Sequence, residues 1–233
     1  MNNYIPLNSQ EHKNLKFKKL DNVGHSSELH LTPVNVQEFS ILCHDYPIVF
    51  VKDSETGQFR AVALLGIKPK QNLYLTDGGW EAEYIPEYLR QYPFLLSMDP
   101  NDSDKGMLCI DSDCEAFNDD EGEALFNEDG THTDFTRHMG EFIANYNARQ
   151  QSTINFAKEL TDLSLLVSKN LELSLPNDEQ FNLTGIYVID ETMLKSMPEE
   201  DYLSLREKGI MAPIYTHLFS LSRINKLLKL SQK

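Results

Sequence analysis

The first half of the chain alternates between apolar and polar positions in a way that predicts β-structure. Residues 47–53 and 58–67 are apolar and rich in β-branched side chains. They flank an Asp-Ser-Glu-Thr-Gly turn, so they predict a β-hairpin. Lysines alternate with Leu15, Phe17 and Leu20, which is typical of a strand at the edge of a sheet. Similar apolar runs predict further strands near residues 72–76, 94–96, 107–110 and 181–189.

Residues 131–233 follow a helical rhythm instead. Apolar residues recur at near-heptad spacing over residues 135–163, which predicts one long helix whose cap is Thr131 or Thr133. A polar stretch at residues 149–153 interrupts this stripe and indicates a kink or a change of packing partner. Such a stripe is typical of a core, and the alternative is the seam of a homodimer.

Shorter helices are predicted on either side of this segment. An apolar face recurs over residues 34–46. After a loop at residues 175–177, helices are expected to begin at Asp190 or Thr192, at Pro198-Glu199-Glu200, and at Pro213. Gly209 is expected to end the second of these three.

These patterns predict an α+β fold. We expect a mostly antiparallel sheet of about five to six strands, packed with one long helix and a C-terminal helical cluster. At 233 residues the chain can hold one substantial core, so we expect a single domain over residues 1–233. Residues 99–134 would form an acidic loop within it.

One segment stands out from the general pattern, Tyr-Ile-Pro-Glu-Tyr-Leu-Arg-Gln-Tyr-Pro-Phe at residues 84–94. Pro86 suits the first turn of a short helix, and Pro93 closes that helix because it disfavours helical backbone in the residue before it. The ordinary interpretation is a packing corner that buries the tyrosine rings. The alternative is a ligand-binding site made of Trp80, Tyr84, Tyr88, Arg90 and Tyr92.

Composition narrows the classes of partner. The net charge of −15 argues against nucleic acid and against an anionic membrane surface, since both require a basic face. The longest apolar runs are too short to span a bilayer, and the first twenty residues do not form a secretory signal. Three sparse cysteines suit reduced thiols, so we expect a cytoplasmic protein.

The acidic segment invites comparison with a calcium site. Asp111, Asp113 and Glu115 have the spacing of an EF-hand loop, but Ala116 and Gly122 stand where that motif needs glycine and glutamate. Cys109 and Cys114 have no second cysteine pair to complete a zinc site. We therefore predict no metal and no cofactor.

Templates for catalysis are also missing. The sequence holds no Gly-x-Ser-x-Gly elbow, phosphate loop, dinucleotide motif or His-Glu-x-x-His helix. Cys43, His44 and Asp45 are neighbours that point about 100° apart on a helix, so they cannot form a triad with one another. His30, His44 and His217 remain candidates for a site that forms only in three dimensions.

Three blocks of the sequence carry a resemblance. The central one is the tyrosine segment at 84–94. The N-terminal one is His-Leu-Thr-Pro at 30–33 with Glu38-Phe39 and Tyr-Pro-Ile-Val-Phe at 46–50, and the C-terminal one is Gly-Ile-Tyr-Val-Ile-Asp-Glu at 185–191 followed by Tyr-Thr-His-Leu-Phe-Ser-Leu at 215–221. Together they resemble the bacterial SapC-like family. The family is associated by name with surface-layer proteins and with peptide transport, and the resemblance carries over no catalytic residue.

Three functions are consistent with these features. The favoured one is a non-catalytic cytoplasmic binding or accessory protein that engages a peptide or protein partner through its aromatic centre and acidic face. The first alternative is a small-molecule-binding enzyme with a pocket at Trp80 to Tyr92 and one histidine. The second, implied only by the family's name, is an exported surface-layer component.

Overall fold

The computed structural model describes residues 3–99, 102–174 and 180–232, so the loop predicted at 175–177 lies outside the described residues. The chain divides into two compact units. Unit 1 combines Met1–Val23 with Leu89–Ala148, and unit 2 combines Gly24–Tyr88 with Arg149–Lys233. The expectation of a single domain stays a prediction.

The larger sheet of unit 1 has three antiparallel strands. β9 (Asp102–Asp111) lies in its centre, between β1 (Tyr4–Pro6) and β8 (Phe94–Asp99). In this register Cys109 pairs with Pro6 on one side and with Leu95 on the other. The segment predicted as an acidic loop therefore contributes the central strand of a sheet.

A second small sheet in unit 1 corrects the prediction of an edge strand in the lysine-rich run. β2 (Lys16–Phe17) is only two residues long and lies between β10 (Phe117–Asn118) and β11 (Glu123–Ala124). β2 is central because the acidic segment pairs with it on both sides. Lys18 forms an ion pair of 2.6 Å with Glu121, and the Lys16 ammonium donates to the Asp120 carbonyl, so two of the lysines contact that segment.

Phenylalanine rings fill the core of unit 1. The Phe17 ring lies 5.3 Å from that of Phe94, edge to face, and 5.6 Å from that of Phe135, stacked. Leu108 and Ile110 are buried in the same cluster.

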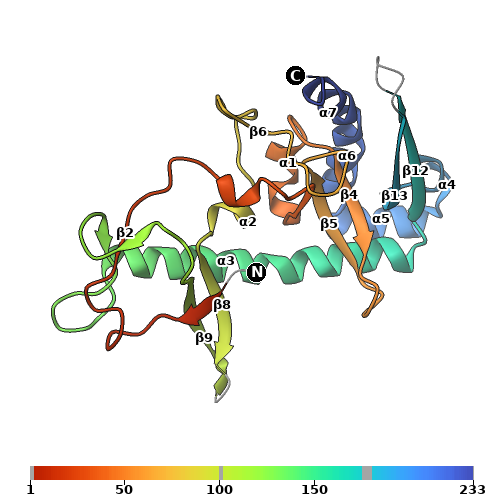
Figure 1. The fold of residues 1–233 in the computed structure, drawn as a ribbon. Helices are drawn as coiled ribbons and strands as arrows, with labels where there is room; N and C mark the ends of the chain where they lie inside the picture. The colour runs from red at the N-terminus through yellow and green to blue at the C-terminus, as the bar shows by residue number, and fades with distance from the viewer. Residues whose placement is uncertain (1–2, 100–101, 175–179, 233) are drawn as a thin grey trace. The chain divides into compact units, whose positions relative to one another are not determined.

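The sheet of unit 2 has five antiparallel strands in the order β12-β13-β4-β5-β3. The strands are β3 (Leu31–Pro33), β4 (Ile48–Lys52), β5 (Phe59–Leu64), β12 (Leu166–Ser174) and β13 (Gln180–Ile189). Figure 1 shows the β4–β5 hairpin in orange and the β12–β13 hairpin in blue-green. The predicted hairpin and the late returning strand are both confirmed.

Membership of this sheet differs from the prediction. β3 was not predicted, and the strands expected at 94–96 and 107–110 belong to β8 and β9 of unit 1. β12 was not predicted, because the polar residues Ser168, Lys169 and Glu172 dilute its apolar alternation. The run at 72–76 forms only β6 (Leu75–Thr76), which pairs with β7 (Gly79–Trp80) and stays apart from the main sheet.

Helices follow the predicted order, although the early ones are short. The helix expected at 34–46 is a 3-10 turn η2 (Val36–Glu38) and a single turn α1 (Phe39–Leu42). α2 (Glu87–Arg90) is shorter than the proline positions suggested. A further 3-10 turn is η1 (Gly24–Ser26), and the C-terminal cluster is α4 (Glu191–Ser196), α5 (Glu199–Glu207), α6 (Met211–Ser220), η3 (Leu221–Arg223) and α7 (Ile224–Leu230).

The long helix α3 (Asp134–Asp162) is continuous through its polar stretch. The boundary between the units falls between Ala148 and Arg149, so this stretch marks a change of packing partner. Ile143 is buried in the core of unit 1, and the Phe156 ring contacts that of Phe39 in unit 2. The chain therefore uses the apolar stripe of α3 itself, and we do not place a homodimer seam there.

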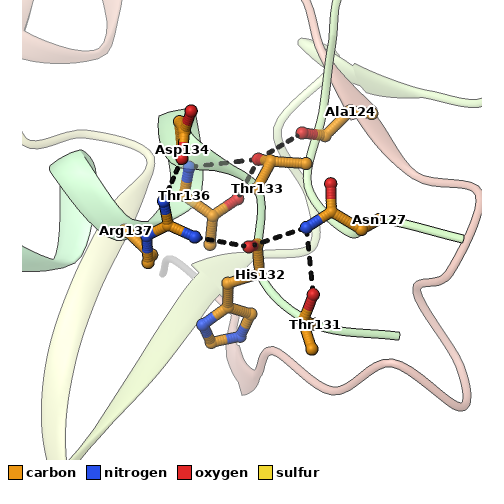
Figure 2. A network of polar contacts seen from close by, with 8 residues as sticks. All are labelled: Ala124, Asn127, Thr131, His132, Thr133, Asp134, Thr136 and Arg137. Carbon is orange, nitrogen blue, oxygen red and sulfur yellow. Dashed lines mark hydrogen bonds and ion pairs between the residues drawn. The ribbon is translucent and has the colours of Figure 1, made fainter. Parts of the chain in front are cut away.

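Figure 2 shows the polar network at the start of α3. The Thr133 hydroxyl accepts a hydrogen bond of 3.3 Å from the Thr136 amide, which makes Thr133 the cap of the helix. The same hydroxyl donates to the Ala124 carbonyl at 2.7 Å, and the Thr136 hydroxyl donates to the Leu125 carbonyl at 2.8 Å. One cap therefore ties the helix to the strand β11 that precedes it.

We expect Thr133→Ala to lower the free energy of unfolding by about 1 kcal/mol, because the variant loses the cap. Thr133→Ser keeps the hydroxyl and serves as the matched control, so its stability should stay close to that of the native protein. Chemical denaturation of both variants checks this, and equal stability of Thr133→Ala and Thr133→Ser would contradict it.

Candidate functional site

Trp80 lies over two buried tyrosines of unit 2. The tight β6–β7 turn positions it, and Gly79 in this turn has a φ of +109°, which favours glycine. The indole Nε1 donates to the Tyr46 hydroxyl at 2.6 Å, and that hydroxyl donates to the Tyr84 carbonyl at 2.5 Å. The polar atom of Trp80 is therefore occupied inside the protein.

Tyr74 completes this aromatic cluster. Its ring centroid lies 4.5 Å from that of Tyr46 and 5.9 Å from that of Trp80, and its hydroxyl donates to the Asp45 carbonyl at 2.6 Å. Burial raises the pKa of both Tyr46 and Tyr74 above the ordinary value for tyrosine. Both hydroxyls therefore stay protonated and act as structural donors.

The buried side chain of Glu38 extends this hydrogen-bond network through Tyr84. It accepts hydrogen bonds from the Asn35 amide at 3.0 Å, the Tyr84 hydroxyl at 3.1 Å and the Glu87 amide at 2.9 Å. Burial raises its pKa, and the backbone donors act in the opposite direction. Glu87, held in this way at the start of α2, forms an ion pair of 2.6 Å with Arg149.

The five residues predicted as a ligand-binding site, Trp80, Tyr84, Tyr88, Arg90 and Tyr92, divide between the two units. Trp80 and Tyr84 join the buried network in unit 2. Arg90 and Tyr92 belong to unit 1, where the Arg90 guanidinium lies 5.5 Å from the centre of the Phe142 ring and the Tyr92 hydroxyl donates to Asp111 at 3.1 Å. Tyr88, which is 37% exposed, lines a cavity.

The hydrogen bond between Tyr92 and Asp111 also bears on the EF-hand-like spacing of the acidic segment. The Asp111 carboxylate is buried and accepts from the Asn3 amide, the Asp113 amide and the Tyr92 hydroxyl. It therefore fixes the backbone of the acidic segment. In the described part of the chain, no group of three or more His, Cys, Asp or Glu side chains is arranged to hold a metal ion.

The three candidate histidines have three different settings in unit 2. His44 is exposed, and His30 is partly buried, with its carbonyl accepting from the amides of Leu65 and Gly66. His217 is fully buried on α6, with its ring 5.3 Å from that of Phe50, and neither ring nitrogen has a hydrogen-bond partner. This environment lowers the pKa of His217 to about 3, because burial disfavours the charged imidazolium.

The cavity beside Tyr88 has a volume of about 300 Å3, which is within the range of ligand pockets. Of the candidate site residues predicted from the sequence, only Tyr88 lines this cavity. Its apolar lining comes from Pro33, Val34, Phe59, Ala61 and Ile154, and its polar lining from Asn35, Gln58, Arg60, Gln150 and Thr153.

A second cavity of about 240 Å3 adjoins the first along α3. Gln58, Phe59 and Ile154 line both, and the second extends to Lys158 and Thr161. We call the two cavities together the Tyr88 groove. Its walls are the start of β5, the second part of α3 and the segment after β3, all within unit 2.

Thr153 shows how the sequence builds this groove. Its hydroxyl accepts from the Val36 amide at 2.9 Å and so fastens α3 to the segment after β3. Thr153 and Gln150 come from the polar stretch that interrupts the apolar stripe of α3. The interruption of the stripe, predicted as a kink or a change of packing partner, therefore also supplies polar lining to the Tyr88 groove.

A family model for SapC matches residues 7–227, which is nearly the whole chain. The chain belongs to the SapC family. This confirms the resemblance found in the sequence blocks. Comparison of this SapC-family chain with curated proteins and with solved structures finds no match. Within the described ranges, none of its helices combines the length and apolar character that a membrane span requires.

We expect Tyr46→Phe to lower the free energy of unfolding by about 1–3 kcal/mol, because it removes the hydroxyl that accepts from the Trp80 N–H and donates to the Tyr84 carbonyl. Tyr202→Phe is the matched control, since Tyr202 is 39% exposed. Urea denaturation measures both, and a Tyr46→Phe protein as stable as the Tyr202→Phe protein would show that the network contributes little.

His217 gives a prediction for pH. The unfolded chain takes up this proton near the ordinary pKa of 6.5, whereas the folded chain does so only near 3. The unfolded state therefore binds more protons in this interval, and stability falls as the pH decreases from about 6.5, by up to about 1.4 kcal/mol per pH unit. Stability above pH 6.5 should not depend on this group.

Unfolding free energies measured between pH 7 and pH 5 test this expectation. His217→Leu should flatten the profile, and His44→Leu, which changes an exposed histidine, should leave it as in the native protein. An identical slope in His217→Leu and the native protein would show that other groups cause the loss of stability.

Proposed function

We propose that this SapC-family protein is a non-catalytic binding or accessory protein that holds an extended, uncharged peptide segment in the Tyr88 groove. The observation that carries the proposal is the lining of the groove. Apolar side chains alternate with side-chain amides there, and none of the lining residues is an aspartate, glutamate, histidine or cysteine.

The polar lining suits a peptide backbone. A peptide unit presents one donor and one acceptor, and the side-chain amide of Asn or Gln offers both functions. Gln58 and Gln150 place two such amides on the walls of one cavity, and the buried Asn35 beside them belongs to the scaffold, since its Oδ1 accepts from the Thr153 hydroxyl. Phe59 and Ile154 line both cavities and offer apolar surface to the side chains of a bound segment.

The charges at the groove favour a segment without net charge. Arg60 forms an ion pair of 3.0 Å with Asp53, and Lys158 forms one of 2.6 Å with Asp162. Both cations of the lining are thus compensated by neighbouring carboxylates of the same chain. A charged ligand would have to compete with these pairs, whereas an uncharged one would not.

The polar groups that acid–base chemistry would use support a binding role over catalysis. The tyrosine hydroxyls and the indole of the aromatic cluster are engaged in internal hydrogen bonds, and His217 is sealed in the core. Tyr88 and Lys158 are the lining residues whose side chains could transfer a proton, and Lys158 is paired with Asp162, so neither cavity is lined by a carboxyl or imidazole group.

As part of the same proposal we place the protein in the cytoplasm, where its three free thiols would stay reduced. The acidic segment of unit 1 offers a second contact to a basic partner, as in a component of a peptide-transport or surface-layer system. The Tyr88 groove would then select the segment, and the acidic face would speed the encounter.

Adjacent glutamines on α3 provide a sharp test. Gln150 lines the groove, whereas Gln151 is exposed and its side chain donates to Asn155. The probe is a library of capped, uncharged tetrapeptides that vary one apolar position, with binding followed by amide chemical shifts. We expect Gln150→Trp to fill the cavity and weaken binding by about tenfold or more, and Gln151→Trp to bind like the native protein.

Two outcomes would contradict the proposal. In one, no member of the library shifts the amides of residues that line the groove. In the other, the two tryptophan variants lose binding equally. A small molecule that instead shifts the amides around Trp80 would favour the enzyme alternative.

A further inference from the structure

Exposed apolar side chains are concentrated on the C-terminal helices of unit 2. Seven large hydrophobic residues are exposed in the described part of the chain, and five of them lie on α4, α5 and α6. Phe219 is the most exposed of these, at 69%. The five are Met193, Tyr202, Leu203, Tyr215 and Phe219. This concentration is unusual, because isolated exposed hydrophobic residues are normally scattered.

Three of these residues form one continuous patch. Tyr215 and Phe219 are four residues apart on α6, so they lie on the same face, opposite the buried Ile214 and His217. The Tyr215 hydroxyl interacts with that of Tyr202 on α5. We call Tyr202, Tyr215 and Phe219 the α5–α6 patch.

The two borders of the patch carry opposite charges. Glu199, Glu200 and Asp201 form the first turn of α5 and directly precede Tyr202. From Lys208 to the end of the chain there is no acidic residue, and Arg223, which is exposed, follows Phe219 by four residues. Within this segment Lys208 is paired with Glu159 and Lys226 with Asp45, so the basic border of the patch is Arg223, whose Nε also donates to the Cys43 carbonyl.

We propose that the α5–α6 patch binds the same patch on a second copy of this chain, related by a two-fold axis. A two-fold axis brings each surface point of one copy to the equivalent point of the other, so a usable surface must be complementary to itself. With the axis through the aromatic row, the acidic border of each copy meets the basic border of the other, and the contact forms twice.

The chemistry of the patch favours a second copy over other occupants. An acidic partner would be attracted by Arg223 but repelled by the acidic first turn of α5. A basic partner would be attracted by that turn but repelled by Arg223. An anionic membrane surface would likewise be repelled by Glu199, Glu200 and Asp201. A partner surface that has an acidic border and a basic border can pair with the two borders of the patch at once. A second copy of this chain has such a surface.

Sedimentation velocity of the full chain over a range of protein concentrations tests the proposal. The native protein should sediment as a dimer at the higher concentrations. Phe219→Asp should weaken the dimer by about a hundredfold or more, since it places a carboxylate in the apolar centre. Tyr88→Asp makes the same kind of change at another exposed aromatic residue, and it should leave the dimer intact.

Charge exchange tests the two-fold arrangement itself. Arg223→Glu should weaken the dimer by about tenfold, because it opposes the acidic border of the partner. Adding Glu200→Arg in the same chain should restore the affinity. Thermal unfolding of each variant establishes that it is folded.

A native protein that stays monomeric at every concentration would overturn the proposal. So would a dimer that Phe219→Asp leaves unchanged, or a dimer whose affinity the double exchange does not restore. None of these outcomes bears on peptide binding in the Tyr88 groove, which is tested with separate variants.

Discussion

The buried carboxyl group of Glu38 is the interaction on which the described site depends. Removing a carboxylate from water is costly unless donors replace the lost hydration, and three donors from three points of the chain do so here. The amides come from Asn35 and Glu87, and the hydroxyl comes from Tyr84. From Tyr84 the connection continues through Tyr46 to Trp80, and from Glu87 it continues to Arg149 on α3. Tyr88, which lines the Tyr88 groove, directly follows Glu87, whose amide donates to the Glu38 carboxyl.

This arrangement explains why the aromatic segment is a scaffold. Its tyrosine hydroxyls and indole N–H could have faced a ligand, but each hydrogen bond described for them ends within the protein. Rigid, fully bonded groups hold neighbouring surfaces in place, and the neighbouring surface here is the Tyr88 groove. The residues proposed to bind a peptide therefore lie beside the aromatic cluster, and most of them are outside the tyrosine-rich segment.

Local patterns predicted the parts of the fold that local forces determine. The β4–β5 hairpin, the span of α3 and the cap at Asp190 all depend on residues close together in the sequence, and all three were predicted. The pairing of β2 with β10 and β11 joins segments about a hundred residues apart, and alternation along one strand carries no information about its partner. The same limit applies to the site, since Gln58 and Gln150 become neighbours only when β5 packs near α3. The predicted tyrosines were recognised correctly as unusual, but their partners could not be read from spacing.

The continuity of α3 has a consequence for how the molecule can be divided. Each unit takes two separate segments of the chain, and the helix supplies secondary structure to both. A cut between the units at Ala148 would create two new helix ends, each with unsatisfied backbone groups, and would separate the two segments of unit 2, because Gly24–Tyr88 would stay with unit 1. Short helices without a packing surface are only marginally stable in water. Loss of order in one unit therefore shortens the helix on which the other depends, and folding of the two units is thermodynamically coupled through a single backbone.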